Sequence, residues 1–335
     1  MDISLLEKFD SQKMYTIYDD WPNLANKAYT SNLESANFEN IDHIVFVGMG
    51  GSGAIGDLFA SILSKTNIHV SVVKGYLLPK TVDENTLVVT TSVSGNTAET
   101  LTVLESAQKL DCQIIAFCSG GKMERFCIDN EINFRIIHLI HSPRASFVTY
   151  VYSILNVLHN ILPIGENDIL SSIDSLFVMH KQISSNNLTD SNLAINLANW
   201  ITGIPLIYYP HGLQSAAIRL KSALQENSKI HAIAEDVIEA CHNGIVAWET
   251  SSIVQPILLR GSDDYIKTKE RYSIIEQYFT ENNIDFKTIN SVDGNILTKL
   301  ISLIYLFDYI SIYFAVSAQI DPSPVYSIDY VKNKI

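Results

Sequence analysis

Two short segments of the sequence combine glycine and hydroxyl residues in a pattern suited to phosphate binding. The first is VFVGMGGSGAIGDLF, in which an apolar run leads into Gly48, Gly50, Gly51, Ser52, Gly53 and Gly56. Glycine lets a chain turn tightly and lets a ligand approach the backbone. The N-terminus of a helix that follows would offer unpaired N–H groups to an anion. The segment therefore predicts a strand, an anion-binding turn and a helix.

The same segment fits the GxGxxG pattern of dinucleotide-binding turns through Gly48, Gly50 and Gly53. That pattern also expects an acidic residue at the end of the second strand, where it binds the ribose. The sequence has Lys74 in that place, within the run from Val73 to Tyr76. A nicotinamide-dependent oxidoreductase is therefore an alternative that depends on the glycines alone, and a glycine turn without any ligand is another.

The second segment, LVVTTSVSGNTAETL, carries Ser92, Ser94, Gly95 and Thr97 between an apolar run and a helical stretch. A single hydroxyl would be enough to cap that helix. Three hydroxyls and a glycine in six residues exceed what capping needs, and they could surround a phosphate with neutral donors and backbone amides. Neither GxxxxGKS nor GxxxxGKT occurs in the chain, so the sequence predicts phosphate binding without a P-loop lysine.

Short β-branched runs alternate with longer helical stretches along the chain, which is typical of parallel sheets covered by helices. The expected strands are His43 to Gly48, Asn67 to Lys74, Thr86 to Thr91, Gln113 to Cys118, Phe134 to Ile140, Ile204 to Tyr209, Ile230 to Glu235, Val254 to Arg260 and Asp285 to Ile289. The expected helices include Gly53 to Ser64, Thr97 to Leu110, Gln214 to Gln225, Asp264 to Glu281 and Asn295 to Ser317, with a helical bridge from Ala145 to Asn196. The fold class is α/β, with two units of similar size.

Composition narrows the class of protein. A chain of 335 residues is long enough for two domains. Its formal net charge of −13 argues against a nucleic-acid partner, and its four cysteines show no CxxC spacing. The start, MDISLLEKFD, has no basic region followed by an apolar one, so a cytoplasmic location is expected. The apolar stretch from Leu300 to Ala318 predicts a buried helix, because Asp308 at its middle would cost about 2.5–3.5 kcal/mol in a membrane.

The pairing of GMGGSG with SVSGNTAETL resembles the sugar isomerase (SIS) domain, a flavodoxin-like unit that binds phosphosugars. Later blocks resemble successive motifs of the bifunctional phosphoglucose/phosphomannose isomerase family, in the order SPRASF, RLKSALQENSK, CHNGIVAWE and DPSPVYSIDYVK. The resemblance implies two flavodoxin-like SIS domains, each a parallel sheet flanked by helices, and a C-terminal helix. It divides the chain into residues 1–160, 161–320 and a segment 321–335 that closes on the active site.

The resemblance also implies an activity. Glucose 6-phosphate and mannose 6-phosphate would be interconverted with fructose 6-phosphate through a cis-enediol, without a metal or any other cofactor. Such a reaction needs a base that moves a proton between C2 and C1, a role for a carboxylate whose pKa is raised by its surroundings. Glu226 matches the family's catalytic glutamate, although from its own context it would be a solvated glutamate at a helix end.

Other site residues follow from the resemblance in the same way. His242 matches the histidine that opens the sugar ring, and the family implies that it reaches the neighbouring subunit of a homodimer. Lys332 matches a lysine that lines the site, and Arg144 would face the reacting carbons and hold the charge of the enediolate. The sugar and its 6-phosphate would contact Gly51, Ser52, Ser92, Ser94 and Thr97.

The chain departs from the family pattern at three positions. Gly244 stands where glutamate is common, Val93 where tyrosine is usual, and Ala247 where glycine is common. One alternative is a sugar-phosphate sensor without catalysis, which the retained Glu226 and His242 disfavour. A metal site at His138 and His141 is another, but HxxH on a strand end does not aim both rings alike.

Overall fold

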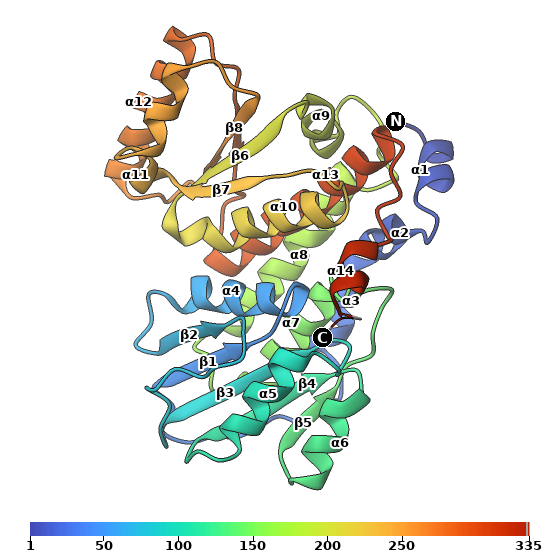
Figure 1. Cartoon of the computed structure of the whole chain (residues 1–335), viewed down its shortest axis with the longest axis vertical. Helices are drawn as coiled ribbons and strands as arrows, with labels where there is room; N and C mark the ends of the chain where they lie inside the picture. The colour runs from blue at the N-terminus through green and yellow to red at the C-terminus, as the bar shows by residue number, and fades with distance from the viewer. Residues whose placement is uncertain (333, 335) are drawn as a thin grey trace. The chain divides into compact units, whose positions relative to one another are not determined.

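The computed structural model describes residues 1–332 and 334, and the chain forms two compact units (Figure 1). The N-terminal unit comprises Asp20–Ile173. The C-terminal unit comprises Met1–Asp19 together with the chain from Asp174 onward. Each unit contains one parallel sheet and the helices that cover it, which confirms the predicted α/β class with two flavodoxin-like domains.

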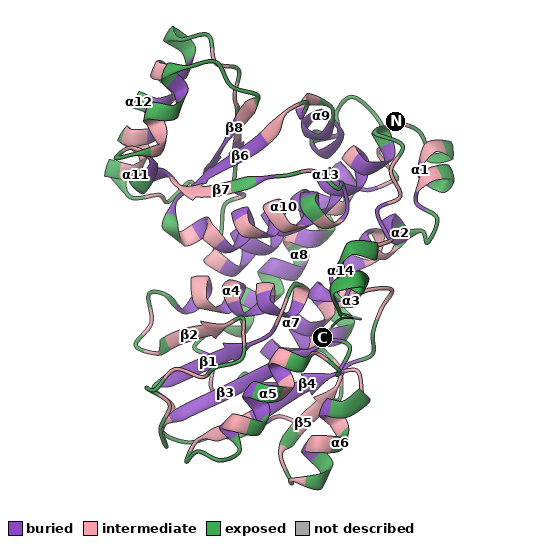
Figure 2. Ribbon diagram, in the orientation of Figure 1, coloured by how far each residue is buried: buried purple, intermediate pink, exposed green. Residues whose placement is uncertain are grey.

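The sheet of the N-terminal unit has five strands in the order β2-β1-β3-β4-β5, all parallel. The strands are β1 (His43–Val47), β2 (His69–Val73), β3 (Thr86–Ser92), β4 (Gln113–Cys118) and β5 (Asn133–Ile136). All residues of β1 and β3 are buried, as expected for strands covered on both faces (Figure 2). This strand order is that of flavodoxin, whose ligand lies where the order reverses, between β1 and β3.

Helices cover this sheet and follow its strands in the usual alternation. They are α3 (Trp21–Tyr29), α4 (Gly51–Leu63), α5 (Ala98–Ala107), α6 (Gly121–Asp129) and α7 (Phe147–Val157). Gly56 shows why α4 needs small residues, because a Cβ there would lie 3.0 Å from the side chains of Phe46 and Val72. The glycine lets the helix approach the strands closely.

The sheet of the C-terminal unit has the order β7-β6-β8-β9, again all parallel. The strands are β6 (Ile204–Tyr209), β7 (Ile233–Asp236), β8 (Val254–Arg260) and β9 (Lys287–Asn290). The order β7-β6-β8-β9 corresponds to the order β2-β1-β3-β4 of the first four strands in the N-terminal sheet. The two units therefore resemble each other in topology. The helices are α1 (Ile3–Phe9), α2 (Met14–Asp19), α9 (Leu193–Trp200), η1 (His211–Leu213), α10 (Gln214–Glu226), α11 (Val237–Ala240), η2 (Gly244–Glu249), α12 (Ile266–Glu281), α13 (Ile296–Ser317) and α14 (Tyr326–Lys332).

The helical bridge expected from Ala145 to Asn196 is present. Helices α7 and α9 lie at its two ends, and between them α8 (Glu166–Ile183) runs from the N-terminal unit into the C-terminal unit. No strand lies in this stretch of the described chain.

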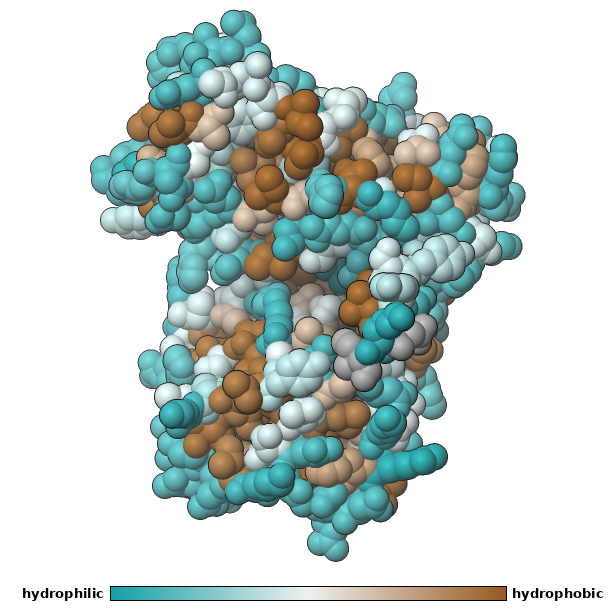
Figure 3. Space-filling view, viewed as in Figure 1, coloured by the Kyte–Doolittle hydropathy of each residue, from teal (hydrophilic) through white to brown (hydrophobic). Residues whose placement is uncertain are grey.

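Helix α13 is the long apolar helix that the sequence predicted. It is long and apolar enough to cross a membrane, yet 89% of its most apolar window is buried inside the protein. Asp308 at its middle is fully buried and pairs with Arg219 of α10. Tyr305 and Tyr309 of the same helix donate hydrogen bonds to α2, which ties the N-terminal residues to this unit. On the face drawn in Figure 3, hydrophobic residues form separate patches among hydrophilic ones.

Candidate active site

The two predicted phosphate-binding turns lie at one edge of the N-terminal sheet. The glycine turn follows β1, and the serine-threonine turn follows β3. Because β1 and β3 are parallel neighbours at the point where the strand order reverses, their turns flank the crevice in which flavodoxin-like sheets bind ligands.

The glycine turn has a backbone that side chains would disrupt. Gly50 has a φ of +53° and precedes the first residue of α4. A Cβ on Gly48 would lie 2.8 Å from the backbone of Ser52, and one on Gly53 would lie 2.8 Å from the carbonyl oxygen of Gly48. No side chain caps α4, so the turn presents the N-terminus of a 13-residue helix, an anion-binding feature.

Ser52 connects the two turns. Its hydroxyl oxygen accepts a hydrogen bond from the backbone N–H of Val93, at 3.3 Å. Ser52 is buried, and Val93 lies between the two serines of the second turn. The structure thus joins the two segments that the sequence singled out.

The hydroxyls of the serine-threonine turn are not explained by capping. Thr97 is the N-cap residue of α5, but its side chain makes no capping hydrogen bond. Its oxygen instead accepts a hydrogen bond from Ser92 at 3.0 Å. Ser94 is exposed, and its oxygen accepts a hydrogen bond from the N–H of Asn96 at 3.3 Å. The alternative that one of these hydroxyls only caps the helix is therefore wrong for Thr97.

Gly95 fixes this turn against the start of α6. Its φ is +66°, and a Cβ on it would lie 1.7 Å from the carbonyl oxygen of Gly120. The carbonyl of Gly95 accepts from the N–H of Met123 at 2.9 Å, and the side chain of Asn96 accepts from the N–H of Lys122 at 3.1 Å. Only glycine allows this close approach.

Arg144 reaches the same neighbourhood from the loop before α7. A Cβ on Gly51 would lie 3.1 Å from the carbonyl oxygen of Pro143 and 3.3 Å from the Cα of Arg144. Arg144 is only 6% exposed, and Trp21 donates a hydrogen bond to the next carbonyl, that of Ala145, at 2.9 Å. The backbone of Arg144 thus lies beside the glycine turn, and its side chain is buried.

Glu226 belongs to the C-terminal unit, where it is the last residue of α10 and is half-buried. The two residues that follow are anchored to α13. The side-chain amide of Asn227 donates to the hydroxyl of Ser311, and the hydroxyl of Ser228 donates to the Ser311 carbonyl, both at 2.8 Å. Glu226 therefore lies at a helix end whose position is fixed by buried hydrogen bonds.

The buried pair of Arg219 and Asp308 lies along the same two helices. Nε of Arg219 donates to Oδ1 of Asp308 at 2.8 Å, and Nη2 donates to Oδ2 at 2.6 Å. Burial alone would lower the pKa of Arg219, but the Asp308 carboxylate more than offsets it and the net shift is upward. The pair joins α10 to α13 behind Glu226.

The C-terminal segment meets the chain close to Glu226. The Nζ of Lys229 donates to the carbonyls of Glu226 and Pro324, the latter at 2.8 Å. Helix α14 begins two residues after Pro324 and carries the exposed Lys332. The structure thus brings the segment that carries Lys332 to the end of α10.

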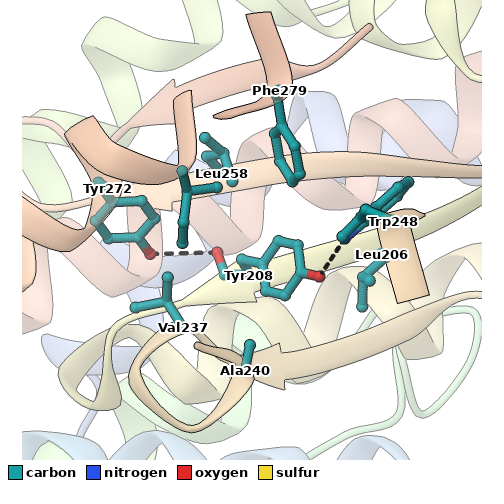
Figure 4. Packing of buried hydrophobic residues seen from close by; sticks show 9 residues of the cluster. Leu206, Tyr208, Val237, Ala240, Trp248, Leu258, Tyr272 and Phe279 are labelled. Carbon is teal, nitrogen blue, oxygen red and sulfur yellow. Dashed lines mark hydrogen bonds between the residues drawn. The ribbon is translucent and has the colours of Figure 1, made fainter. Parts of the chain in front are cut away.

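His242 lies in the loop between α11 and η2 and is exposed. Asp236 caps α11 by accepting from the N–H groups of Ile238 and Glu239. Trp248 closes the loop by donating from its indole to the hydroxyl of Tyr208 at 2.9 Å (Figure 4). Its ring also packs edge-on against that of Phe279. The loop that presents His242 is therefore firmly anchored to the core.

Topology separates Glu226 from His242 within this unit. Helix α10 connects β6 to its parallel neighbour β7, so its last residue lies where β7 begins. His242 follows the far end of β7, after the single turn of α11. The two residues therefore lie at opposite ends of the strands of this sheet.

Glu235 is a residue that the sequence did not single out. A Cβ on Gly244 would lie 2.7 and 2.8 Å from the two carboxylate oxygens of Glu235. This contact gives a physical reason for glycine at position 244, because a side chain there would need the space of the carboxylate. The only sequence signal is the acidic run EDVIE, which begins inside β7.

The sequence also raised a metal site at His138 and His141 as an alternative. Within residues 1–332 and 334, no three His, Cys, Asp or Glu side chains are grouped so that they could hold a metal ion. The dinucleotide alternative would need an acidic residue at the end of β2. The residue there is Lys74, which forms an ion pair with Asp57 of α4.

Two family models cover most of the chain. The SIS domain matches residues 37–159, and the bacterial phospho-glucose isomerase C-terminal SIS domain matches residues 190–335. Fold and comparison together define a protein of two SIS domains. The chain is 32% identical to the bifunctional phosphoglucose/phosphomannose isomerase of Caldicellulosiruptor bescii, over 94% of this chain and 96% of that protein. It therefore belongs to the bifunctional phosphoglucose/phosphomannose isomerase family and is an isomerase.

Two further proteins are similar to this chain at lower sequence identity. The D-glucosamine-6-phosphate 4-epimerase of Sulfolobus acidocaldarius is 29% identical over 71% of this chain and 73% of that protein. The C-terminal domain of glucosamine-fructose-6-phosphate aminotransferase from Francisella tularensis has a TM-score of 0.71 at 16% identity, covering 93% of this chain and 98% of that one. The latter similarity supports the fold alone.

Proposed function

We propose that the chain interconverts glucose 6-phosphate and mannose 6-phosphate with fructose 6-phosphate in the cytoplasm, without a metal ion. The observation that carries this proposal is the 32% identity to the Caldicellulosiruptor bescii isomerase over 94% of this chain. The motifs that contain Glu226, His242 and Lys332 resemble those of the family and support the assignment of these residues. The hydrogen-bonded pair of turns in the N-terminal unit supports a phosphate site of the kind that such substrates need.

In the proposed reaction, the 6-phosphate binds to Ser92, Ser94 and Thr97 and to the backbone amides that open α5. Gly51 and Ser52 contact the sugar. These groups are neutral, so they allow an anion to bind in a chain whose formal net charge is −13. Binding through the phosphate orients the reacting carbons, which is the first requirement of the proton transfer.

Ring opening and proton transfer use different groups. His242 takes the proton of the C1 hydroxyl and gives one to the ring oxygen, so that the ring bond breaks and the C1 carbonyl forms. Glu226 then removes the proton from C2 and returns it at C1 through a cis-enediol, while the proton of the C2 hydroxyl moves to the C1 oxygen and the C2 carbonyl forms. Arg144 and Lys332 stabilise the negative charge that develops on the enediol oxygens.

We further propose that the active site is shared between two copies of the chain. Glu226 and His242 lie at opposite ends of the strands of one sheet. A second copy of the chain would therefore supply the histidine to the site that contains Glu226. Mixing Glu226→Gln chains with His242→Ala chains tests this. In a dimer with shared sites, each mixed pair has one intact site, and activity returns to about a quarter of the wild-type value. Zero activity after proven exchange of subunits would contradict shared sites.

Glu226→Gln tests the base. Isomerisation of both aldoses should fall by at least about a thousandfold, because the amide cannot accept the C2 proton. Binding of fructose 6-phosphate, measured by calorimetry, should stay within about twofold, because the phosphate contacts are unchanged. The matched control is Glu281→Gln, which changes an exposed glutamate that also ends a helix. A Glu226→Gln chain with the wild-type rate would refute the assignment.

The same assays distinguish the proposed activity from two other functions. A sugar-phosphate sensor would bind fructose 6-phosphate without turnover in the wild-type chain. The similarity to the Sulfolobus acidocaldarius epimerase makes D-glucosamine 6-phosphate the second substrate to assay. Epimerisation of that sugar without any turnover of fructose 6-phosphate would replace the proposal.

A further inference from the structure

The carboxylate of Glu235 fills the space that a side chain on residue 244 would need. Its two oxygens lie 2.7 and 2.8 Å from the position of a Cβ on Gly244. Glu235 belongs to β7, whereas Gly244 begins η2, two residues after His242. The strand therefore delivers a negative charge to the loop that presents His242.

The other acidic side chains of this segment have structural partners. Asp236 caps α11, and Glu239 accepts a hydrogen bond from the side chain of Asn243 at 2.9 Å. The carboxylate of Glu235 makes no hydrogen bond or ion pair with any residue that the structure describes. It is half-buried, and burial, followed by the charges of Glu239 and Asp236, raises its pKa. A half-buried carboxylate without such a partner lowers the stability of the fold, and a functional role would account for its presence.

The loop is rigid enough to hold this charge in place. Trp248 is buried, and its indole donates to the hydroxyl of Tyr208, a fully buried residue of β6 (Figure 4). The side chain of Asn243 accepts a hydrogen bond from the N–H of Gly244 and donates one to Glu239. Both ends of the turn around His242 are thus fixed, and Glu235 lies against its middle.

We propose that Glu235 is a positioning residue for His242 in ring opening. The inference rests on the proposed function. While His242 exchanges protons with the C1 hydroxyl and the ring oxygen, its imidazole is transiently cationic, and a carboxylate beside its loop stabilises that cation. The contact with Gly244 also fixes the backbone that presents the ring. The carboxylate is thus supplied by β7 to a loop that has no side chain of its own at residue 244.

The test separates ring opening from proton transfer. Exchange between the anomers of glucose 6-phosphate, measured by NMR, reports ring opening alone. In Glu235→Gln this exchange and the isomerisation should both fall by about tenfold or more, with a melting temperature no lower than that of the wild type. In Glu226→Gln the anomers should still exchange while isomerisation is lost. A Glu235→Gln chain with wild-type anomer exchange would overturn the proposal.

A second comparison tests whether a carboxylate at this place is what matters. Glu235→Ala frees the space beside residue 244, and adding Gly244→Glu returns a carboxylate to it from the loop. The double variant should recover anomer exchange relative to Glu235→Ala, and no recovery in a folded double variant would overturn the role of the charge. If the double variant does not fold, Glu235→Gln decides. Glu249→Gln, at the exposed end of η2, is the matched control.

The proposed function and this inference fail differently. A wild-type chain that neither isomerises nor exchanges the anomers of any sugar phosphate would remove the proposed function. A wild-type chain that does both, beside a Glu235→Gln chain that does both equally well, would remove only the role of Glu235.

Discussion

The hydroxyl oxygen of Ser52 accepts a hydrogen bond from the backbone N–H of Val93 at 3.3 Å, and this contact joins two turns that lie far apart in the sequence. Each turn follows one of the two neighbouring strands at which the order of the sheet reverses. The contact places the N-terminus of α4 beside the hydroxyl residues that precede α5. A phosphate bound there would meet two helix N-termini and several neutral donors.

Thr97→Val should weaken binding of the phosphosugar and leave the fold intact. The valine keeps the shape of the side chain but removes a hydroxyl that makes no capping bond in the structure. Loss of one hydrogen bond to a charged phosphate costs about 1.5–3 kcal/mol, so KM should rise roughly tenfold or more. Thr102→Val is the control on the same helix, where the exposed hydroxyl donates to the Ala98 carbonyl. Equal KM values in steady-state assays of the two variants would contradict the phosphate site.

Gly95→Ala should destabilise the N-terminal unit. A Cβ would lie 1.7 Å from the carbonyl oxygen of Gly120, and the φ of +66° strains any other residue. The loss should be about 2 kcal/mol or more, measured as a change in urea unfolding. Gly75→Ala is the control, because nothing lies within 4 Å of its Cβ position. Matching unfolding curves for the two variants would contradict the described turn.

Removing one partner of the buried pair of Arg219 and Asp308 should lower the stability strongly, whereas replacing both partners with apolar residues should lower it little. The two side chains are 4% and 0% exposed. Asp308→Ala removes the carboxylate that pairs with a buried guanidinium and should lower the free energy of unfolding in urea by about 3–5 kcal/mol. Arg219→Met with Asp308→Leu should recover most of that loss. Glu270→Gln, which breaks an exposed pair with Lys267, should cost less than about 1 kcal/mol. A single variant as stable as this control would mean that the pair is not buried in solution.

His43 should make stability depend on pH. Its ring accepts or donates hydrogen bonds with Thr86 at 3.2 Å and Ser71 at 3.0 Å, and its pKa is lowered by burial and by the nearby His69. The unfolded chain therefore binds a proton at a higher pH than the folded one does. The contribution of His43 to the free energy of unfolding is fully present above about pH 6.5 and is lost as the pH falls towards the lowered pKa of this histidine.

Urea unfolding between pH 5 and 8 measures this effect. His43→Gln should flatten the pH dependence below about pH 6.5, whereas His231→Gln, which changes an exposed histidine, should leave it as in the wild type. Parallel pH curves for wild type and His43→Gln would show that another group is responsible.

Much of the fold could be predicted from the sequence, because buried parallel strands are short β-branched runs between helices. The bounds of β4, β6 and β8 agree with the predicted strands to the residue, and α13 was recognised from its length and from the charge of Asp308. The partner of that charge, Arg219, was not predicted. Pairing of two distant residues leaves no local pattern in the chain.

The candidate site was predicted in part. The residue types of the two turns already indicated phosphate chemistry, while Glu226, His242 and Lys332 came from the resemblance to a family and stay proposals. The contact of Glu235 with Gly244 and the bond from Lys229 to Pro324 could not be predicted, because each depends on how a strand or a tail folds back. The N-terminal helices likewise join the C-terminal unit through contacts that no spacing reveals.

The proposed isomerisation is tested most directly by following fructose 6-phosphate by NMR in deuterium oxide, with the purified wild-type chain and excess EDTA. We expect glucose 6-phosphate and mannose 6-phosphate both to form, and part of each product to carry deuterium at C2, because the proton that Glu226 holds exchanges with solvent. Absence of both aldoses at micromolar protein, or their appearance only after a metal ion is restored, would contradict this proposal.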